Sequence, residues 1–326
     1  MDTKKSVLKK LEKSKGRPVS GSVIAMNLGI SRTAVWKAIC ALRKEGHEIE
    51  GGSGRGYVLS EKSDKLSREG IETDLKYDIE VLYLESVDST NKEAMRRALD
   101  EPTKTALIVS NNQTQGKGRL GRSFYSPPDT GIYMSFLFRP KFDVSKSAIV
   151  TAAAATAVCR SIEKVTGIKC SIKWVNDIYS RGQKVSGILT EAVSGFETGA
   201  IEYLIVGIGI NCTTVNFPKE AGDFPGSLGS PFPRYALIPE IANTFLPMLE
   251  NMSPDVFIDY YRDHSLVIGK NIKVFPTGKY EDEESQGIDA FVTGISSDGG
   301  LMVRYPSGKE DVLRSGEITV RPLDRW

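Results

Sequence analysis

The sequence predicts an α+β protein of several domains, and three observations lead to that prediction. The chain has 326 residues, which exceeds the usual size of one domain, and its 40% apolar residues are enough for a large core. The spacing of apolar residues changes from helical to alternating strands and helices, and then to short alternating segments. Charge is also unevenly distributed. We therefore expect an N-terminal helical unit with a β-wing, a central α/β domain with a mixed sheet, and a small C-terminal β-barrel.

The charge distribution separates the first sixty residues from the rest. Residues 1–60 contain twelve Lys and Arg against five Asp and Glu, whereas the remaining residues contain 31 basic and 36 acidic side chains. A small basic unit attached to an acidic body predicts a polyanionic partner for the first unit only.

Residues 1–60 have the pattern of a helix-turn-helix. The expected inner faces of three helices are Val7, Leu8 and Leu11, then Val23, Ile24 and Leu28, then Val35, Ala38, Ile39 and Leu42. Gly29 stands where a tight turn needs a positive φ, and Ser31 is placed to cap the third helix. The segment Glu48–Leu59 predicts two short strands around a glycine-rich tip, which is typical of a β-wing.

The outer face of the third helix carries cations and short polar side chains. Such groups near the start of a recognition helix suit docking in the major groove of DNA. Helix-turn-helix units also occur as protein-docking modules, but the charge excess and the wing favour DNA binding. The candidate DNA-binding residues are Ser31, Arg32, Thr33, Trp36, Lys37 and Arg55.

Residues 61–76 are polar and lack periodicity, so we interpret them as a linker to a central domain over residues 77–268. The expected central strands are Ile79–Leu84, Ala106–Ser110, Ile132–Arg139, Lys184–Glu191 and Tyr203–Asn211, with a long helix over about Ser145–Thr166. The segment Ile172–Ile178 is expected to be a strand that breaks into a turn at Asn176 and Asp177. Short alternating segments over residues 269–326 predict the barrel, with the charged run Glu281–Glu284 at a hairpin tip.

Three short segments of the central domain have an unusual composition. Gln113–Arg122 alternates three glycines with three cations, which suits an anion site, although a solvated basic loop is the plainer interpretation. The residues Ser89, Thr90 and Asn91 follow a strand and either cap the next helix or contact a ligand. Gly207 and Gly209 face one side of a buried strand, where a planar ligand or a closely packed helix would explain glycine.

Targeting and metal-binding signals are absent from the sequence. The N-terminus has no apolar signal-peptide segment, and the apolar run Ala148–Cys159 is too short to span a bilayer. Four cysteines without paired spacing and two histidines do not form a zinc pattern. We expect a cytoplasmic protein with reduced cysteines, no membrane association and no metal held by protein ligands.

Five motifs together resemble one family. The motifs are Asp88–Asn91, Gln113–Arg122, Lys173–Asp177, Lys184–Leu189 and Gly207–Asn211. In this order they resemble the bifunctional biotin–protein ligases, the bacterial enzymes that also repress the biotin biosynthesis operon. The resemblance includes the winged helix and Ser315–Arg321, and it implies a central domain of the biotin/lipoate ligase type followed by an SH3-like barrel. Two residues depart from the family pattern: Val175 replaces the usual proline, and Phe124 stands where the aromatic residue is often tryptophan.

The resemblance implies an activity and a set of site residues. Biotin and ATP would form biotinyl-5′-adenylate, with Mg²⁺ accompanying ATP, and a lysine of biotin carboxyl carrier protein would then accept the biotinyl group. The implied catalytic residues are Lys184 and Arg119. The implied biotin-binding residues are Ser89, Thr90, Asn91, Gln113, Lys117, Gly118, Arg119, Lys184, Gly187, Gly207 and Gly209. The implied nucleotide-binding residues are Arg119, Arg122, Phe124, Asn176, Asn211 and Arg321.

The resemblance also implies operator DNA as a partner and a homodimer that biotinyl-adenylate favours. Two alternatives stay open at this point. A lipoate–protein ligase shares the catalytic fold, but the winged helix and the basic loop speak against it. A transcription factor that senses a ligand without catalysis would not need Lys184 and the cations of the loop.

Overall fold

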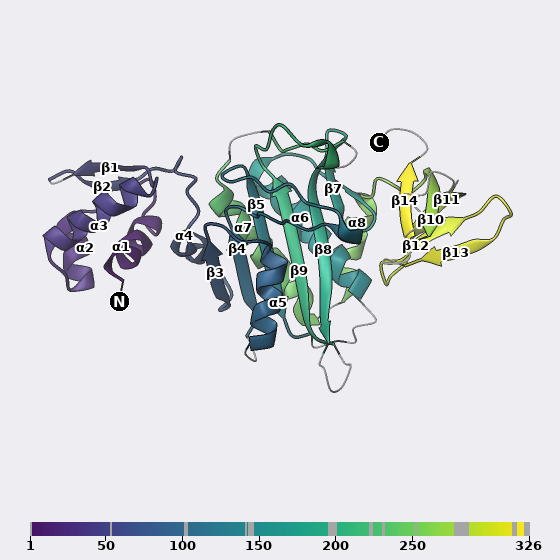
Figure 1. The fold of residues 1–326 in the computed structure, drawn as a ribbon, viewed down its shortest axis with the longest axis horizontal. Coiled ribbons are helices and arrows are strands. Elements are labelled where there is room, and N and C mark those ends of the chain that lie inside the picture. Colours follow the sequence, from purple (N-terminus) through teal and green to yellow (C-terminus); the bar gives the residue numbers. More distant parts are fainter. Residues whose placement is uncertain are drawn as a thin grey trace.

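The N-terminal unit of the computed structural model is a winged helix-turn-helix, as predicted (Figure 1). The structure describes residues 2–52, 54–100, 104–140, 142, 147–194, 201–221, 224–229, 232–251, 253–276, 287–314 and 318–322. The elements of the winged unit are α1 (Thr3–Glu12), α2 (Gly21–Leu28), α3 (Arg32–Lys44), β1 (Ile49–Gly52) and β2 (Gly56–Leu59). The two strands pair in antiparallel register.

Local sequence signals account for most of the winged unit. Gly29 ends α2 with φ +63°, and the Ser31 hydroxyl accepts a hydrogen bond from the Ala34 amide at the start of α3 (3.1 Å). The predicted inner residues of α1 and α3 are buried in one apolar cluster. Val23 is an exception, because 43% of its surface is exposed. In α2 the buried positions are Ile24 and Ala25, one residue further along the helix.

The segment that we interpreted as a linker is folded, which corrects that interpretation. It contains α4 (Arg68–Thr73), whose first turn is capped by Ser67 through the Gly70 amide (3.0 Å). Leu66 and Ile71 are buried in the core of the central sheet. Apolar positions too few to show a period can still anchor a short helix, so polarity alone was misleading. The domain boundaries at residues 60, 76 and 268 stay predictions.

The central domain contains a seven-stranded mixed sheet, in agreement with the prediction. Its strands, in spatial order, are β3 (Glu80–Leu84), β4 (Ala106–Ser110), β5 (Gly131–Phe138), β9 (Ile201–Asn211), β8 (Gln183–Ser194), β7 (Asp177–Ser180) and β6 (Ser171–Lys173). The strands β3 and β4 are parallel, and the other neighbouring pairs are antiparallel. The predicted break within residues 172–178 is present: β6 ends at Lys173, and a turn over residues 174–176 leads into β7 at Asp177.

Helices cover both faces of this sheet (Figure 1). One face packs against α6 (Ser147–Thr166), α7 (Arg234–Asn251) and α8 (Ile258–Asp263), where buried alanines of α6 allow close approach. The other face carries α5 (Thr90–Asp100), which contacts β5 and β9 and covers a smaller apolar cluster that includes Ala94 and Ile205. This cluster occupies only part of its face, which leaves room for a cavity beyond the N-terminus of α5. Among the helices described, none is long and apolar enough to cross a membrane.

The C-terminal part forms a small antiparallel sheet at the opposite end of the molecule from the winged unit (Figure 1). Its strands, in spatial order, are β13 (Glu310–Leu313), β12 (Leu301–Arg304), β11 (Ile288–Ile295), β10 (Asn271–Pro276) and β14 (Ile318–Pro322). Its buried residues, such as Ile272 and Val292, belong to the same apolar cluster as the central sheet. The run Glu281–Glu284 lies outside the described residues.

Candidate functional site

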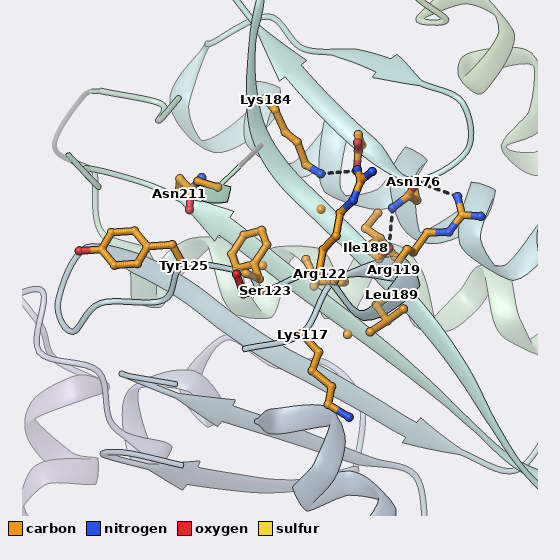
Figure 2. A pocket seen from close by; sticks show the side chains of 18 of the residues that line it. Lys117, Arg119, Arg122, Ser123, Tyr125, Asn176, Lys184, Ile188, Leu189 and Asn211 are labelled. Carbon is orange, nitrogen blue, oxygen red and sulfur yellow. Dashed lines mark hydrogen bonds and ion pairs between the residues drawn. The ribbon is translucent and has the colours of Figure 1, made fainter. Parts of the chain in front are cut away.

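A cavity of about 200 Å³ lies on the face of the central sheet that carries α5 (Figure 2). Its wall is formed by the start of α5, the loop between β4 and β5, and strands β8 and β9. The predicted site residues that line it are Ser89, Thr90, Asn91, Gln113, Lys117, Gly118, Arg119, Arg122, Phe124, Asn176, Lys184, Gly187, Gly207, Gly209 and Asn211. The remaining one, Arg321, belongs to β14, and its side chain lies outside the described part of the chain.

The glycine-rich loop has a defined backbone. The Gly118 amide donates to the Arg122 carbonyl (2.7 Å), and the Phe124 amide donates to the Gly116 carbonyl (2.9 Å), so the loop is a narrow hairpin. At Gly116 a Cβ atom would lie 2.4 Å from the Phe124 carbonyl oxygen, and this approach requires glycine. The tip contains the short 3₁₀ helix η1 (Arg119–Gly121). The hairpin therefore positions Arg119 and Arg122 at the cavity.

Three of the predicted cations gather at one end of the cavity (Figure 2). The Lys184 ammonium lies 2.8 Å from Asp177 Oδ1, and Arg119 Nη1 donates to Asn176 Oδ1 (3.3 Å). Burial lowers the pKa of the Arg119 guanidinium; Asp177 opposes this shift, and Arg122 adds to it. An arginine keeps its proton in proteins despite such a shift. This end of the cavity is therefore cationic and suits phosphate or carboxylate groups.

Lys117 does not join this group. Figure 2 shows its side chain extending away from Lys184 and Arg119, and the residue is exposed. The cavity thus brings together the cations of Arg119, Arg122 and Lys184, whereas the Lys117 ammonium is directed elsewhere.

The two glycines of β9 admit side chains of the protein itself. At Gly207 a Cβ atom would lie 2.2 Å from Asn91 Oδ1, and at Gly209 it would lie 2.5 Å from the Phe124 ring. Asn91 belongs to α5, so the close approach of a helix, one of our two explanations, accounts for Gly207, whereas an aromatic ring of the basic loop accounts for Gly209. Both glycines also line the cavity, and contact with a planar ligand stays a prediction. Glycine is required because Asn91 and Phe124 approach the strand backbone directly.

The end of the cavity opposite the cations is a buried, neutral polar surface. Gln113 Oε1 accepts a hydrogen bond from the Thr90 amide (2.9 Å), and Gln113 Nε2 donates to Ser126 Oγ (2.9 Å). Ser135 is fully buried on β5, with its hydroxyl 2.7 Å from Thr90 Oγ1. Ser89 beside them is also buried. Donors and acceptors at fixed positions make this end suitable for a neutral ring that contains both kinds of group.

The predicted asparagines have structural partners. Asn176 Nδ2 donates to the Ile188 carbonyl (2.9 Å), so this amide is oriented by β8 and in turn holds Arg119. Asn211 Nδ2 donates to the Gly226 carbonyl (3.1 Å). Its buried Oδ1 has no hydrogen-bond donor among the residues that the structure describes. That oxygen is available to accept from a bound molecule.

Sequence reasoning missed several residues of the site. Asp177 and Trp174 lie within one of the five motifs, yet only Asn176 of that motif was assigned a role. Trp174 is buried, and its indole Nε1 donates to the Gly299 carbonyl of the C-terminal sheet (2.9 Å), a contact that no local pattern announces. Ser135 and Glu191 do not line the cavity but form hydrogen bonds to Thr90 or Asn91 in its wall, and they were missed as well. A polar residue in an otherwise apolar strand is the signal that could have identified Ser135.

The candidate DNA-binding residues lie on α3, at its cap and on the wing. Arg32, Thr33, Trp36, Lys37 and Arg55 are exposed, and 56% of the Trp36 surface is accessible. Ser31 lies beside them as the cap of α3.

Arg43, on the same helix, has a structural role instead. Its guanidinium donates to the Ile49 and Gly51 carbonyls of β1 (2.7 and 2.8 Å), which braces the wing against α3.

Comparison with known proteins places both parts of the chain. Residues 83–211 match the biotin/lipoate A/B protein ligase family, and residues 3–58 match the HTH domain family. The bifunctional ligase/repressor BirA of Bacillus subtilis is 40% identical over 215 residues, which are 64% of this chain and 66% of the Bacillus protein. The biotin–[acetyl-CoA-carboxylase] ligase of Paracoccus denitrificans is 33% identical over 249 residues, which are 72% of this chain and 98% of that relative.

A solved structure is similar as well. The biotin protein ligase from Aquifex aeolicus in complex with biotin and ATP superposes with a TM-score of 0.61 at 28% identity, covering 74% of this chain and 99% of that one. The fold, the arrangement of the cavity and these similarities agree with one another. The chain belongs to the biotin/lipoate A/B protein ligase family.

Proposed function

We propose that the protein is an ATP-dependent biotin–protein ligase that also represses transcription of the biotin biosynthesis operon in response to biotin. The observation that carries the proposal is that this cavity has one neutral end and one cationic end. Its neutral end, around Thr90 and Gln113, suits the ureido ring of biotin, and its cationic end, around Arg119 and Lys184, suits a carboxylate beside a phosphate. A ligand with these two ends would fit the cavity in one orientation.

In the first step a carboxylate oxygen of biotin attacks the α-phosphorus of ATP. The new P–O bond forms as the bond to pyrophosphate breaks, which gives biotinyl-5′-adenylate and pyrophosphate. Two anions must meet for this reaction, so the main tasks of the protein are alignment and charge neutralisation. Lys184 and Arg119 are held for these tasks by Asp177 and Asn176. Arg122 adds positive charge at the rim of the cavity.

In the second step the amine of a carrier-protein lysine attacks the acyl carbon of the adenylate. An amide bond forms, AMP leaves with the bonding electrons, and the amine loses its proton. No protein nucleophile is needed. Cys212, next to Asn211 in the wall, is unsuited to that role because burial raises its pKa to about 12.

Mg²⁺ is expected to accompany ATP, and the cavity offers it few ligands. Among the described residues no group of three His, Cys, Asp or Glu side chains could hold a metal ion. Asp177 and Glu220 are the carboxylates among the residues that line the cavity, and Asp177 is already paired with Lys184. Mg²⁺ would therefore bind chiefly through the phosphates of ATP and neutralise part of their charge.

The winged unit supports the regulatory half of the proposal. Its exposed cations include Arg32 and Lys37 on α3 and Arg55 on the wing, which suit DNA phosphates and base edges. One winged helix makes few base contacts, so we expect a homodimer on a two-fold operator. Biotinyl-adenylate would favour that dimer, and the biotin carboxyl carrier protein would compete by consuming the adenylate.

The alternatives predict different products in one assay. Lipoate carries no N–H group for the polar surface around Thr90 and Gln113, which favours biotin over lipoate. Purified protein, ATP and Mg²⁺ are incubated with biotin or with lipoate and a biotin carboxyl carrier domain, and the acyl-lysine is detected by mass spectrometry. We expect biotinyl-lysine only. Lipoyl-lysine would establish the lipoate alternative, and absence of any acylation together with biotin-dependent DNA binding would establish a sensor without catalysis.

A further inference from the structure

A buried polar network lies under the neutral end of the cavity and ends at Glu191, a residue without a role in the proposed reaction. On β8, Glu191 follows Leu189 by two positions, so both side chains point to the face that carries the cavity. Glu191 does not line the cavity itself. Its carboxylate accepts a hydrogen bond from Asn91 Nδ2 (2.6 Å), and Asn91 lies in the space that Gly207 leaves open.

The carboxylate fixes the orientation of the Asn91 amide. An ionised carboxylate only accepts hydrogen bonds, so the NH₂ group of Asn91 must face Glu191. The carbonyl Oδ1 of Asn91 then faces the Ser135 hydroxyl, which lies 2.6 Å away. The Asn91 NH₂ group also lies 3.4 Å from the Leu189 carbonyl, which agrees with this orientation.

The Asn91 orientation decides where the single hydroxyl hydrogen of Ser135 goes. That hydroxyl lies 2.6 Å from Asn91 Oδ1 and 2.7 Å from Thr90 Oγ1, and it can donate to only one of them. A carbonyl oxygen has no hydrogen of its own, so at 2.6 Å the Ser135 hydrogen is required on the Asn91 side. A hydrogen must also lie between the Ser135 and Thr90 oxygens at 2.7 Å, so Thr90 donates its own hydrogen to Ser135 Oγ, while Gln113 Oε1, 3.2 Å from the Thr90 hydroxyl, accepts from the Thr90 amide. The Thr90 oxygen therefore keeps its lone pairs.

We infer that Glu191 is a positioning residue which, through Asn91 and Ser135, keeps the Thr90 hydroxyl oxygen as an acceptor for an N–H group of the ligand. The inference rests on the proposed function, because it explains how the cavity selects a ring with N–H donors, such as the ureido ring of biotin. The specificity of the cavity is thus set partly by a side chain outside its wall.

The Glu191→Gln substitution tests this series of hydrogen bonds from Glu191 through Asn91 and Ser135 to Thr90, called the relay below. An amide of the same size both donates and accepts, so Asn91 is free to turn over, and Ser135 then donates to Thr90 and occupies its lone pair. We expect the Kd for biotin, measured by calorimetry without ATP, to rise roughly tenfold, while the Kd for ATP changes by less than about twofold. Thr190→Val is the matched control. Thr190 is adjacent on β8, and its hydroxyl lies 2.8 Å from that of Thr151 on α6, on the opposite face of the sheet. The Thr190→Val variant should therefore bind biotin and ATP with wild-type Kd values.

Repeating the Glu191→Gln substitution in a Ser135→Ala protein distinguishes an effect through the relay from a general disturbance of the site. In Ser135→Ala the relay is cut and Thr90 stays an acceptor, so biotin affinity should change by less than about threefold, and adding Glu191→Gln should cause no further loss. A full tenfold loss in both backgrounds, or wild-type biotin affinity in Glu191→Gln alone, would overturn the inference. Thermal unfolding of each variant verifies the fold. If the wild-type protein itself binds no biotin, the proposed function fails, and the inference fails with it.

Discussion

The winged unit and the cavity of the central sheet differ in how their residues come together. In the winged unit, the cap Ser31, the turn Gly29 and the apolar faces of three helices lie within about fifty consecutive residues. In the cavity, Thr90, Lys184 and Gly209 belong to segments that are far apart in the chain and meet only through the order of the strands. Local signals therefore define the first region, whereas the second depends on register and packing.

The two regions are also joined by specific contacts. The Lys15 ammonium at the end of α1 lies 3.2 Å from the centroid of the Tyr235 ring on α7 and donates to the Ser63 carbonyl (3.0 Å). Arg234, beside Tyr235, is buried and donates to both Asp64 and the Gly131 carbonyl at the start of β5. The central domain thus has a physical connection to the winged unit, although these residues do not line the cavity.

The largest effect expected from this comparison is on the cavity alone. Lys184→Ala removes an ammonium group that Asp177 holds in place, and loss of one such preorganised group lowers rates by roughly 10²–10³. Pyrophosphate release with biotin and ATP should fall by that factor, while operator DNA binding without ligand stays at the wild-type level. Lys164→Ala is the control, because it removes another paired lysine, on α6. A loss of less than about threefold in Lys184→Ala would contradict the catalytic role.

Replacing one glycine in each region should have different effects: on biotin affinity in the cavity and on stability in the winged unit. In Gly207→Ala the new methyl group would lie 2.2 Å from Asn91 Oδ1, so Asn91 must move, and overpacking of this kind costs about 2 kcal/mol. We expect biotin affinity to fall by roughly 30-fold. In Gly29→Ala the space is open but φ is +63°, so the cost of about 1 kcal/mol should appear in the stability of the winged unit. Equal biotin affinity in both variants would show that Asn91 does not need its present position.

Lowering the pH should decrease the stability of the winged unit, because His47 binds a proton more readily in the unfolded chain. Burial lowers the pKa of His47 to about 4, whereas an unfolded histidine titrates near 6.5. Between these values the unfolded chain binds the proton and the folded chain does not, so stability is lost as pH falls from 6.5 to 4. The expected loss is about 2 kcal/mol at pH 5. Hydrogen exchange of α3 amides at pH 7 and pH 5, corrected for intrinsic rates, measures it. His47→Leu should remove most of the pH dependence, and an unchanged slope in that variant would assign the effect to other groups.

DNA affinity should respond to the exposed face of α3 without a change in the enzyme. Arg32→Ala removes an exposed cation at the start of that helix, and loss of one such contact costs about 1–2 kcal/mol. Operator affinity measured by anisotropy should fall roughly tenfold, with biotinyl-adenylate synthesis unchanged. Lys309→Ala removes the same charge from the C-terminal sheet and serves as the control. Similar losses in both variants would indicate a general charge effect rather than a recognition surface.

The smallest effect concerns the junction between the two regions. Tyr235→Leu removes the ring beneath Lys15, and a cation–π contact of this kind contributes about 1 kcal/mol. The stability of α1 in hydrogen exchange should decrease by that amount, and Tyr235→Phe, which keeps the ring, should behave as wild type. If the leucine and phenylalanine variants are equally stable, the contact does not stabilise the junction.

Sequence reasoning succeeded where a pattern is local or where a motif is long. The strand β4 was predicted at its observed bounds, and the three-part α+β architecture is confirmed. The same reasoning failed at residues 61–76, because the apolar contacts of Leu66 and Ile71 are made with distant parts of the chain. It also failed at Val23, where the helical period alone does not decide which of two neighbouring residues faces the core.

By itself the sequence determined the type of each main element and the chemical character of the site. Glycines, caps and apolar spacing act through bonds and sterics within a few residues, so they hold in any tertiary context. Only the tertiary structure decided that Lys117 points away from the other cations, that Asn91 and Phe124 occupy the space above Gly207 and Gly209, and that Glu191 orients Asn91. Those relations depend on the pairing of β5, β8 and β9, whose register sets which side chains meet across the sheet.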